Sequence, residues 1–377
     1  MMGLKLSRHY PIVHQFDEDS IEEKNPYYMV FATGIQGWRP TMEDAHIVQL
    51  GAVGDDQQSA FFALFDGHGG PDIAQFAAAN IQARVLQHPK LCRYCRSVSN
   101  WQERELNEIV IVGQQRRYPA RRLMLYENTC YALRHALLEI DKEAYALGND
   151  SENPEKYHLI GCTAVVTLIK DKKLYCANIA DSRAIASVSG HAIQLSIEHK
   201  PTDPVEYERV INHKGNMKGY VENGRINGNL AVPRAIGDFY YKNNMEGPPY
   251  DRIVCAWADI TVRTLTDDWE FLVMACDGIW DVMTNAEVVE FVRNRFAQHL
   301  EPRRIAQDLL YTCLAPDTSM GGLGADNMTI EIIALLNGRS FDEFCEKCAT
   351  EPAENCPPQM QFYDESFANR IGMNLKY

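Results

Sequence analysis

The sequence predicts an α+β fold in which antiparallel β-sheets are flanked by helices. Short runs rich in β-branched and aromatic residues have the length and composition of strands, among them "YYMVFATG", "AFFALFD", "TAVVTLI" and "EFLVMACDG". Segments with apolar residues at helical spacing lie between them. The strands outnumber the helices and do not alternate with them regularly, which favours antiparallel sheets over a doubly wound parallel sheet.

Three segments carry the helical pattern. The first is "GPDIAQFAAANIQARVLQ", and the second places Leu133, Leu137 and Ile140 on one face. The third begins after "MTNAE", where Thr284 and Glu287 have the spacing of a capping box. We expect a helix in each segment.

We divide the chain into a main domain over residues 25–338 and two extensions, residues 1–24 and residues 339–377. The C-terminal extension is acidic and contains "EPAENCPP", so we expect it to leave the core as a tail. Within the main domain, residues 88–125 mix charged residues, two cysteines and an arginine cluster. This break in the pattern indicates an insertion.

Composition narrows the class of protein. The chain has 377 residues, and its 37 Lys and Arg against 51 Asp and Glu give a net charge of -14, which argues against a general nucleic-acid binder. No apolar stretch approaches the roughly 18 residues of a membrane span, and the N-terminus lacks the apolar core of a secretory signal. We expect an intracellular, cytoplasmic protein, with a nuclear or membrane-associated location as the alternatives, and a monomer.

Most of the 11 cysteines stand singly in apolar runs, where they pack as small apolar side chains. Two pairs have CxxC spacing, Cys92 with Cys95 and Cys345 with Cys348. Together they could supply four thiolates to one zinc ion. However, about 250 residues separate the pairs, against the ~15–20 of a zinc ribbon, so a shared zinc site is disfavoured.

Three aspartates share one sequence context, the end of a strand. Asp66 ends "FFALFD", Asp277 ends "FLVMACD", and Asp326 stands directly before the last strand. Carboxylates that converge at strand ends repel one another unless a cation neutralises them. No His or Cys accompanies them at metal-ligand spacing, so a hard divalent ion, Mg²⁺ or Mn²⁺, is the expected partner.

Two residues after Asp66 extend this pattern. Gly67 has no Cβ, so its backbone carbonyl could approach a metal ion closely. His68 would then lie beside a bound substrate, with an ordinary pKa near ~6.5 that suits proton transfer. The alternative reading is a common "DG" turn followed by a histidine that caps or packs.

The segment "GWRPTMEDAH" adds an arginine and an acidic pair. Arg39 has the planar guanidinium that grips a phosphate by two hydrogen bonds. Glu43 and Asp44 would complete the shell around metal-bound waters. Taken alone, the segment could equally form a surface turn with an exposed ion pair.

Taken in order, these pieces closely resemble the metal-dependent serine/threonine protein phosphatases of type 2C. The resemblance covers about residues 25–338 and rests on "GWRPTMEDAH", "FFALFDGHGG", "GCTAVVTLI", "ANIADSRAI", "EHKPTDPVEYERV", "INGNLAVPRAIGD", "MACDGIWDVM" and "DNMTI". It implies a central β-sandwich with helices on both outer faces and a two-metal site at one end. Residues 201–228 correspond to a flap region near that site.

The resemblance also implies roles for the metal ligands. Asp66 resembles the carboxylate that bridges both ions, and Gly67 the carbonyl ligand of one. Asp277 and Asp326 resemble ligands of the other ion. Asp181 resembles a ligand of a weaker third ion, with Asp277 and Asp281 as its possible partners.

The remaining roles concern the substrate. Glu43 and Asp44 resemble residues that order metal-bound water, Arg39 the phosphate clamp, and His68 the general acid for the leaving alkoxide. The implied reaction is direct attack by a water on phosphoserine or phosphothreonine of a phosphorylated protein. Cysteine-dependent phosphatases have a glycine-rich loop in which an arginine follows the cysteine after five residues. None of the 11 cysteines of this chain has that setting, so no covalent phosphoenzyme is needed.

Two other functions stay open at this point. An inert member of the family would keep the fold and bind phosphoproteins, and it would be free to lose the aspartates that this chain keeps. A glycosidase with a carboxylate pair would need no metal and gives Arg39 no role. Ala180 and Pro233 depart from the usual family motifs, and the flap departs more, so substrate preference does not follow from the resemblance.

The N-terminal "MGLKLS" matches the pattern for myristoylation at Gly3. Because Met1 precedes this pattern, acylation requires initiation at Met2 or removal of both methionines. A single acyl chain would give weak, reversible membrane association.

Overall fold

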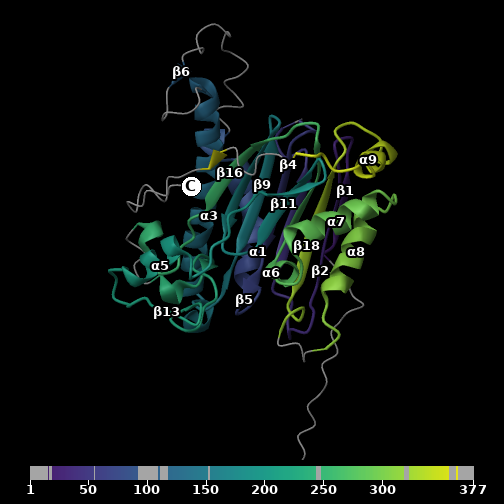
Figure 1. Cartoon of the computed structure of the whole chain (residues 1–377). Coiled ribbons are helices and arrows are strands. Elements are labelled where there is room, and N and C mark those ends of the chain that lie inside the picture. The colour runs from purple at the N-terminus through teal and green to yellow at the C-terminus, as the bar shows by residue number, and fades with distance from the viewer. Residues whose placement is uncertain are drawn as a thin grey trace, which may run out of the picture.

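The computed structural model describes residues 16, 19–54, 56–91, 109–110, 118–151, 153–242, 248–317, 322–355 and 362–363. Its centre is a sandwich of two six-stranded sheets, with helices on both outer faces (Figure 1). Every strand pair within the two sheets is antiparallel. The predicted fold class is therefore confirmed.

The first sheet combines strands from both ends of the chain. Its order is β1 (Ile21–Lys24), β2 (Tyr28–Ile35), β18 (Met328–Leu335), β17 (Trp269–Ala275), β11 (Arg183–Val188) and β12 (His191–Gln194). The second sheet has the order β19 (Phe362–Tyr363), β16 (Asp259–Thr264), β10 (Lys173–Ile179), β9 (Ala164–Lys170), β4 (Ala60–Phe65) and β3 (Ala45–Leu50).

Strand β4 shows why its apolar run is continuous. Phe61, Ala63 and Phe65 face the helix layer, whereas Phe62 and Leu64 face the other sheet. Because successive side chains of a strand point to opposite faces, a strand buried on both faces has no polar alternation. The sequence run "AFFALF" follows from this position inside the sandwich.

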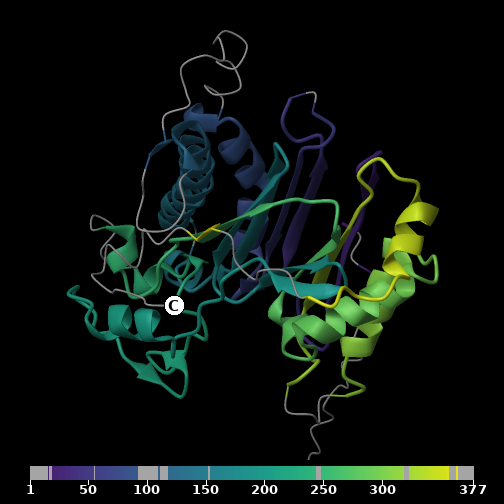
Figure 2. The ribbon, with the colours of Figure 1, turned by 45° about the horizontal axis from the view of Figure 1, so that its top comes forward.

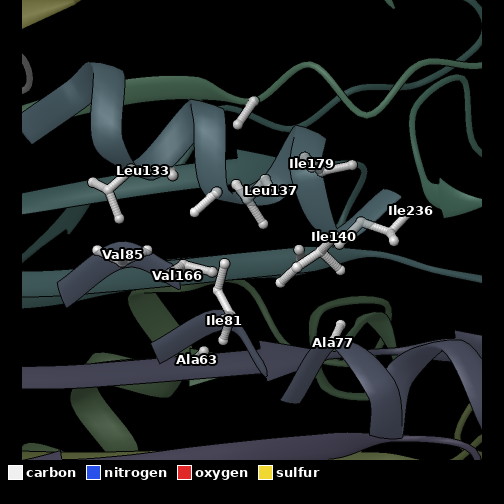
Figure 3. Close-up of a cluster of buried hydrophobic side chains, with 14 of the residues drawn as sticks. Ala63, Ala77, Ile81, Val85, Leu133, Leu137, Ile140, Val166, Ile179 and Ile236 are labelled. Atoms are coloured by element: carbon white, nitrogen blue, oxygen red, sulfur yellow. The ribbon is translucent and has the colours of Figure 1, made fainter. Parts of the chain in front are cut away.

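Two helix layers enclose the sandwich (Figure 2). Helices α1 (Asp72–Leu86) and α3 (Ala120–Asn149) cover the second sheet, and α7 (Asn285–Phe296), α8 (Pro302–Cys313) and α9 (Phe341–Cys348) cover the first. In Figure 3, Leu137 and Ile140 of α3 and Ile81 of α1 converge on the second sheet. The capping box of Thr284 and Glu287 is present at the start of α7, so the three predicted helices are confirmed.

Smaller elements gather at one end of the sandwich. Strands β5 (Gly67–His68), β8 (Gly161–Cys162) and β15 (Ile236–Gly237) form a three-stranded sheet there. The helices α4 (Pro154–Tyr157), α5 (Pro204–Ile211) and α6 (Asp277–Trp280) are short, as are the 3-10 helices η1 (Phe239–Tyr241) and η2 (Pro249–Asp251). The described residues also form two antiparallel two-stranded sheets, β6 (Ile109–Val110) with β7 (Tyr118–Pro119), which lies away from this end (Figure 1), and β13 (Val221–Glu222) with β14 (Arg225–Ile226).

The expectation that the chain leaves the core near residue 339 is wrong for residues 341–348. Helix α9 buries Phe344, Cys345 and Cys348 in the same cluster as α7 and α8. Its N-terminus is fixed by a capping box between Ser340 and Glu343. The acidic composition of the extension comes from the exposed side of this helix and from the residues that follow.

Other parts of the sequence interpretation fall partly outside the described residues. The described residues do not include Gly3, Cys92, Cys95 or most of the expected insertion. A shared zinc site and acylation at Gly3 therefore stay predictions. Cys345 and Cys348 are buried in the α9 interface, which is the packing role expected of single cysteines. None of the described helices is both long and apolar enough to cross a membrane.

A buried charge network fastens the flap region to the second sheet. Glu206 of α5 accepts hydrogen bonds from Arg209 and Arg234. Arg234 also pairs with Asp259 of β16 at 3.2 Å, and His199 lies 3.0 Å from the same carboxylate. Burial alone would raise the pKa of Glu206, but the two guanidinium groups outweigh it and lower that pKa to about 2.

Replacing Phe344 by alanine tests the corrected position of α9. We expect the Phe344→Ala change to lower the free energy of unfolding by about 3–5 kcal/mol, because it leaves a cavity under the helix. Urea unfolding followed by circular dichroism measures this loss. Glu351→Ala, at an exposed position beyond the helix, is the control and should leave stability unchanged. Equal stability of the two variants would contradict the packing described.

Glu206→Gln tests the charge network. Since the pKa of Glu206 is depressed in the folded chain, its stabilising contribution is complete above the unfolded pKa near ~4.3 and is lost as the pH falls toward about 2. We expect the variant to lose about 3–5 kcal/mol at pH 7 and the difference from wild type to shrink below pH 4. Urea unfolding from pH 7 to pH 3 measures it, with Glu208→Gln on the exposed side of α5 as control. A difference that does not change with pH would refute the assignment.

Candidate active site

A cleft of about 750 Å³ opens where the two sheets end beside the flap region. Its lining includes nearly every residue that the sequence singled out, from five separate segments of the chain. They are Arg39, Glu43, Asp66, Gly67, His68, Asp181, Asp277, Asp281 and Asp326. Asp44 lies buried next to this group and interacts electrostatically with Asp66 and Asp326. The structure therefore brings the predicted site residues together.

The carboxylates meet because strands from both sheets end at the cleft. Asp66 follows β4 of the second sheet, and its backbone carbonyl accepts a hydrogen bond from the Thr163 amide at 2.9 Å. Asp277 follows β17, and Asp326 precedes β18, both in the first sheet. Asp181 stands in the turn between β10 and β11, where the chain passes from one sheet to the other.

The proximity of these acids perturbs their proton affinity. Burial raises the pKa of Asp66 well above its ordinary value, and the charges of Asp44 and Asp277 raise it further. Burial and the charges of Asp181 and Asp326 raise the pKa of Asp277 to about 7. For both aspartates burial is the larger cause of the raised pKa, and the like charges beside them add to it.

Two basic side chains compensate part of this charge. Arg39, at the exposed rim, forms an ion pair with Asp326. Lys200 donates a hydrogen bond to the nearly buried Asp181 at 2.6 Å. The acidic neighbours of both groups outweigh burial, which opposes ionisation, and raise the pKa of Arg39 and of Lys200.

The chemistry of this donor set fits divalent metal ions. All the clustered groups are oxygen donors, which suits Mg²⁺ or Mn²⁺, and their mutual repulsion would be relieved by a cation. No three His, Cys, Asp or Glu side chains in the part of the chain that the structure describes are arranged to hold an ion as they stand.

Gly67 has a further reason to be glycine, which the sequence did not reveal. A Cβ at this position would collide with the backbone carbonyl oxygen of Glu43. The close approach of these two segments brings Glu43 and Asp44 beside Asp66. Glu43 is held further by its side chain, which accepts hydrogen bonds from Thr41 Oγ1 at 2.7 Å and from the Gly70 amide at 3.2 Å.

Asn327 fastens the Arg39 loop, a function that sequence reasoning missed. Its side-chain nitrogen Nδ2 donates hydrogen bonds to the backbone carbonyl oxygens of Gln36 at 2.7 Å and Thr41 at 2.9 Å. Its side-chain oxygen accepts from the Glu43 amide at 3.0 Å. One side chain next to Asp326 thus holds both sides of the loop that carries Arg39.

His68 and Asp238 form the second feature that the sequence did not reveal. His68 Nε2 lies 2.7 Å from Asp238 Oδ2, and the Asp238 side chain is only 2% exposed. Burial would lower the pKa of His68, but the charge of Asp238 and neighbouring acids raise it overall. The family motifs quoted above already contain the residues that sequence reasoning missed: "RAIGD" ends in Asp238, "EHKPTD" contains Lys200 and "DNMTI" contains Asn327. Their place in these motifs was the only sequence signal of a role in the site.

Comparison with known proteins identifies the family. Residues 28–320 match the model of the family described as protein phosphatase 2C. This chain belongs to the protein phosphatase 2C family. A probable protein phosphatase 2C of Caenorhabditis elegans is 41% identical over 332 residues, which cover 88% of this chain and 81% of the relative. Protein phosphatase 2C homolog 3 of Schizosaccharomyces pombe is 36% identical over 349 residues, with coverage of 91% and 73%.

Solved structures agree on the fold of this phosphatase. A serine-threonine phosphatase 2C from Toxoplasma gondii superposes with a TM-score of 0.66 at 17% identity, covering 85% of this chain and 99% of that one. A sex-determining protein of C. elegans has a TM-score of 0.60 at 23% identity, with coverage of 87% and 69%. The predictions of the family and of a protein phosphatase are confirmed.

Replacing Asp66 by asparagine tests the charge imbalance of the cleft. The pKa of Asp66 is raised in the folded chain, so its ionised form destabilises the fold above the unfolded pKa near ~3.9. In chelator at pH 8, Asp66→Asn should raise the midpoint of thermal unfolding by a few degrees, on the order of 1 kcal/mol. Differential scanning calorimetry measures this, and the exposed Asp267→Asn is the control. A lower midpoint for Asp66→Asn would contradict the electrostatic description.

Proposed function

We propose that this phosphatase hydrolyses phosphoserine and phosphothreonine in proteins and requires two Mg²⁺ or Mn²⁺ ions. The observation that supports it most is the cluster of mutually repelling carboxylates at the end of the sandwich. Buried carboxylates with raised pKa values destabilise a fold, and such a cost is typical of a functional site. The cleft has an exposed arginine at its rim, as an anionic substrate would need.

The residues assigned to the ions come from the oxygen donors of the cleft. Asp66 and the Gly67 carbonyl would hold one ion, and Asp66 would share the second with Asp277 and Asp326. Bound ions would supply the positive charge that lowers the pKa of an attacking water and stabilises the transition state. Asp181, Asp277 and Asp281 are our candidates for a weaker third ion, because their carboxylates interact around Asp277.

Two side chains act on the substrate in this proposal. Arg39 leaves Asp326 and grips two phosphoryl oxygens through its guanidinium fork. His68, which lines the cleft, gives a proton to the departing serine or threonine oxygen. Glu43 and Asp44 keep their place beside Asp66 and orient water toward the phosphorus. Together these residues bind, orient and protonate, while the sandwich holds them in place.

No observation favours the inert binding module over the enzyme. The chain retains all the carboxylates assigned to the two ions, and they lie in one cleft. The location in the cell, a monomeric state and acylation at Gly3 stay predictions, since none of them follows from the described residues.

Metal-dependent hydrolysis is the direct test. With Mn²⁺, the purified chain should hydrolyse a phosphothreonine peptide and p-nitrophenyl phosphate, and excess chelator should abolish both reactions. Asp277→Asn should lower kcat by about 100-fold or more, because several kcal/mol of charge stabilisation is lost. Steady-state kinetics measure this, with Asp267→Asn as a variant of matched chemistry outside the cleft. Hydrolysis that survives chelation, or an unimpaired Asp277→Asn, would rule out the proposed mechanism.

A further inference from the structure

We infer that Asp238 is a positioning residue for His68: it holds the ring by Nε2 and thereby leaves Nδ1 as the atom that serves the substrate. This inference rests on the proposed function and adds the atom and the partner through which His68 works. The contact between His68 Nε2 and Asp238 Oδ2 is 2.7 Å long. It joins a buried carboxylate to a ring that remains 32% exposed in the cleft.

The two ring nitrogens have different surroundings. Nε2 contacts Asp238, which borders the cleft but has a side chain that is only 2% exposed. Nδ1 makes no hydrogen bond within the part of the chain that the structure describes. A histidine held at one nitrogen by a carboxylate has a fixed orientation and a fixed proton on that nitrogen. The second nitrogen is then the one that can exchange a proton with a ligand.

Strand register brings the two residues together. In the small sheet, His68 of β5 and Gly237 of β15 both pair with Gly161 of the central strand β8. Asp238 follows Gly237, so it emerges beside His68. A Cβ on Gly161 would lie 2.7 Å from His68 Nε2 and would collide with the Asp238 carboxylate. Glycine at position 161 therefore leaves the space in which the pair forms.

The backbone of Asp238 is held independently of His68. Its φ of 53° lies in the left-handed region, which residues other than glycine rarely adopt. Its amide donates to the Ile160 carbonyl at 2.8 Å. Asp141 of α3 accepts hydrogen bonds from the neighbouring Gly237 amide at 2.9 Å and from Lys242 Nζ at 2.5 Å. The loop is thus fixed on both sides of Asp238.

A second histidine–aspartate pair in the chain shows what a purely structural pair looks like. His199 Nε2 lies 3.0 Å from Asp259 Oδ2, and both side chains are 3% exposed. The other ring nitrogen of His199 accepts a hydrogen bond from the Ala180 amide at 3.1 Å. Both nitrogens of His199 are therefore used inside the fold. His68 differs in having one nitrogen left over and an exposed position in the cleft.

The proton transfer balances in this arrangement. When the bond between phosphorus and the serine or threonine oxygen breaks, that oxygen takes the proton from Nδ1 of the doubly protonated ring. The ring is left neutral, with its remaining proton on Nε2 and shared with Asp238. The water whose oxygen bonds to the phosphorus releases a proton to the solvent, and a proton from the solvent returns to Nδ1 before the next turnover.

Two substrates with different leaving groups test the inference on the full chain with Mn²⁺. An alkoxide needs a proton to depart, whereas p-nitrophenolate leaves without one. Asp238→Asn should lower kcat on a phosphothreonine peptide by about 100-fold, within the range of general acid catalysis, and leave KM nearly unchanged. Its kcat on p-nitrophenyl phosphate should fall less than about 10-fold. Thermal unfolding shows whether the variant is folded.

The double variant His68→Gln/Asp238→Asn separates positioning from general damage. If Asp238 acts through His68, the double variant should be no slower on the peptide than His68→Gln alone. Equal losses of Asp238→Asn on both substrates, or additive losses in the double variant, would overturn the inference. A wild-type chain that hydrolyses neither substrate would instead overturn the proposed function.

A measurement on the wild-type chain covers the case in which Asp238→Asn fails to fold. Long-range nitrogen–proton NMR spectra at fixed pH show which nitrogen of each imidazole carries a proton, and His68→Gln assigns the signal. We expect the His68 signal to show a proton on Nε2. A neutral ring with its proton on Nδ1 alone would overturn the inference, whatever the activity.

Discussion

The crowding of carboxylates at one end of the sandwich is the constraint on which the rest of this structure depends. Asp66 and Asp277 lie where burial and like charge raise their pKa values. Repulsion between these carboxylates favours conformations in which they lie further apart. Here they are held in place by strands whose positions are set by apolar contacts over the whole length of the two sheets.

The support around the acids follows from that constraint. Arg39 and Lys200 each neutralise one carboxylate from outside the sheets, and Asn327 fixes the loop that carries Arg39. Gly67 and Gly161 contribute by having no side chain. Gly67 leaves space for the backbone of Glu43, and Gly161 leaves space for the side chains of His68 and Asp238. The site therefore combines charged side chains with glycines that allow close approach.

Helix α9 shows how a local signal was outweighed by composition. Phe341, Phe344, Cys345 and Cys348 have helical spacing, and Ser340 with Glu343 forms a capping box that is visible in the sequence. The acidic, proline-containing residues that follow led us to expect a tail instead. A short helix has little intrinsic stability in water, so only its contact with α7 and the first sheet decides that it forms.

The sequence by itself determined the class of fold, the main helices, the family and the acids of the site. Those features depend on residue types and on spacing within single segments. Only the tertiary structure decided that Asp238 meets His68, that Lys200 meets Asp181, and why position 67 is glycine. Such contacts join segments up to 170 residues apart. They depend on how strands align across a sheet, and a register shift of one residue would remove them while leaving every local pattern unchanged.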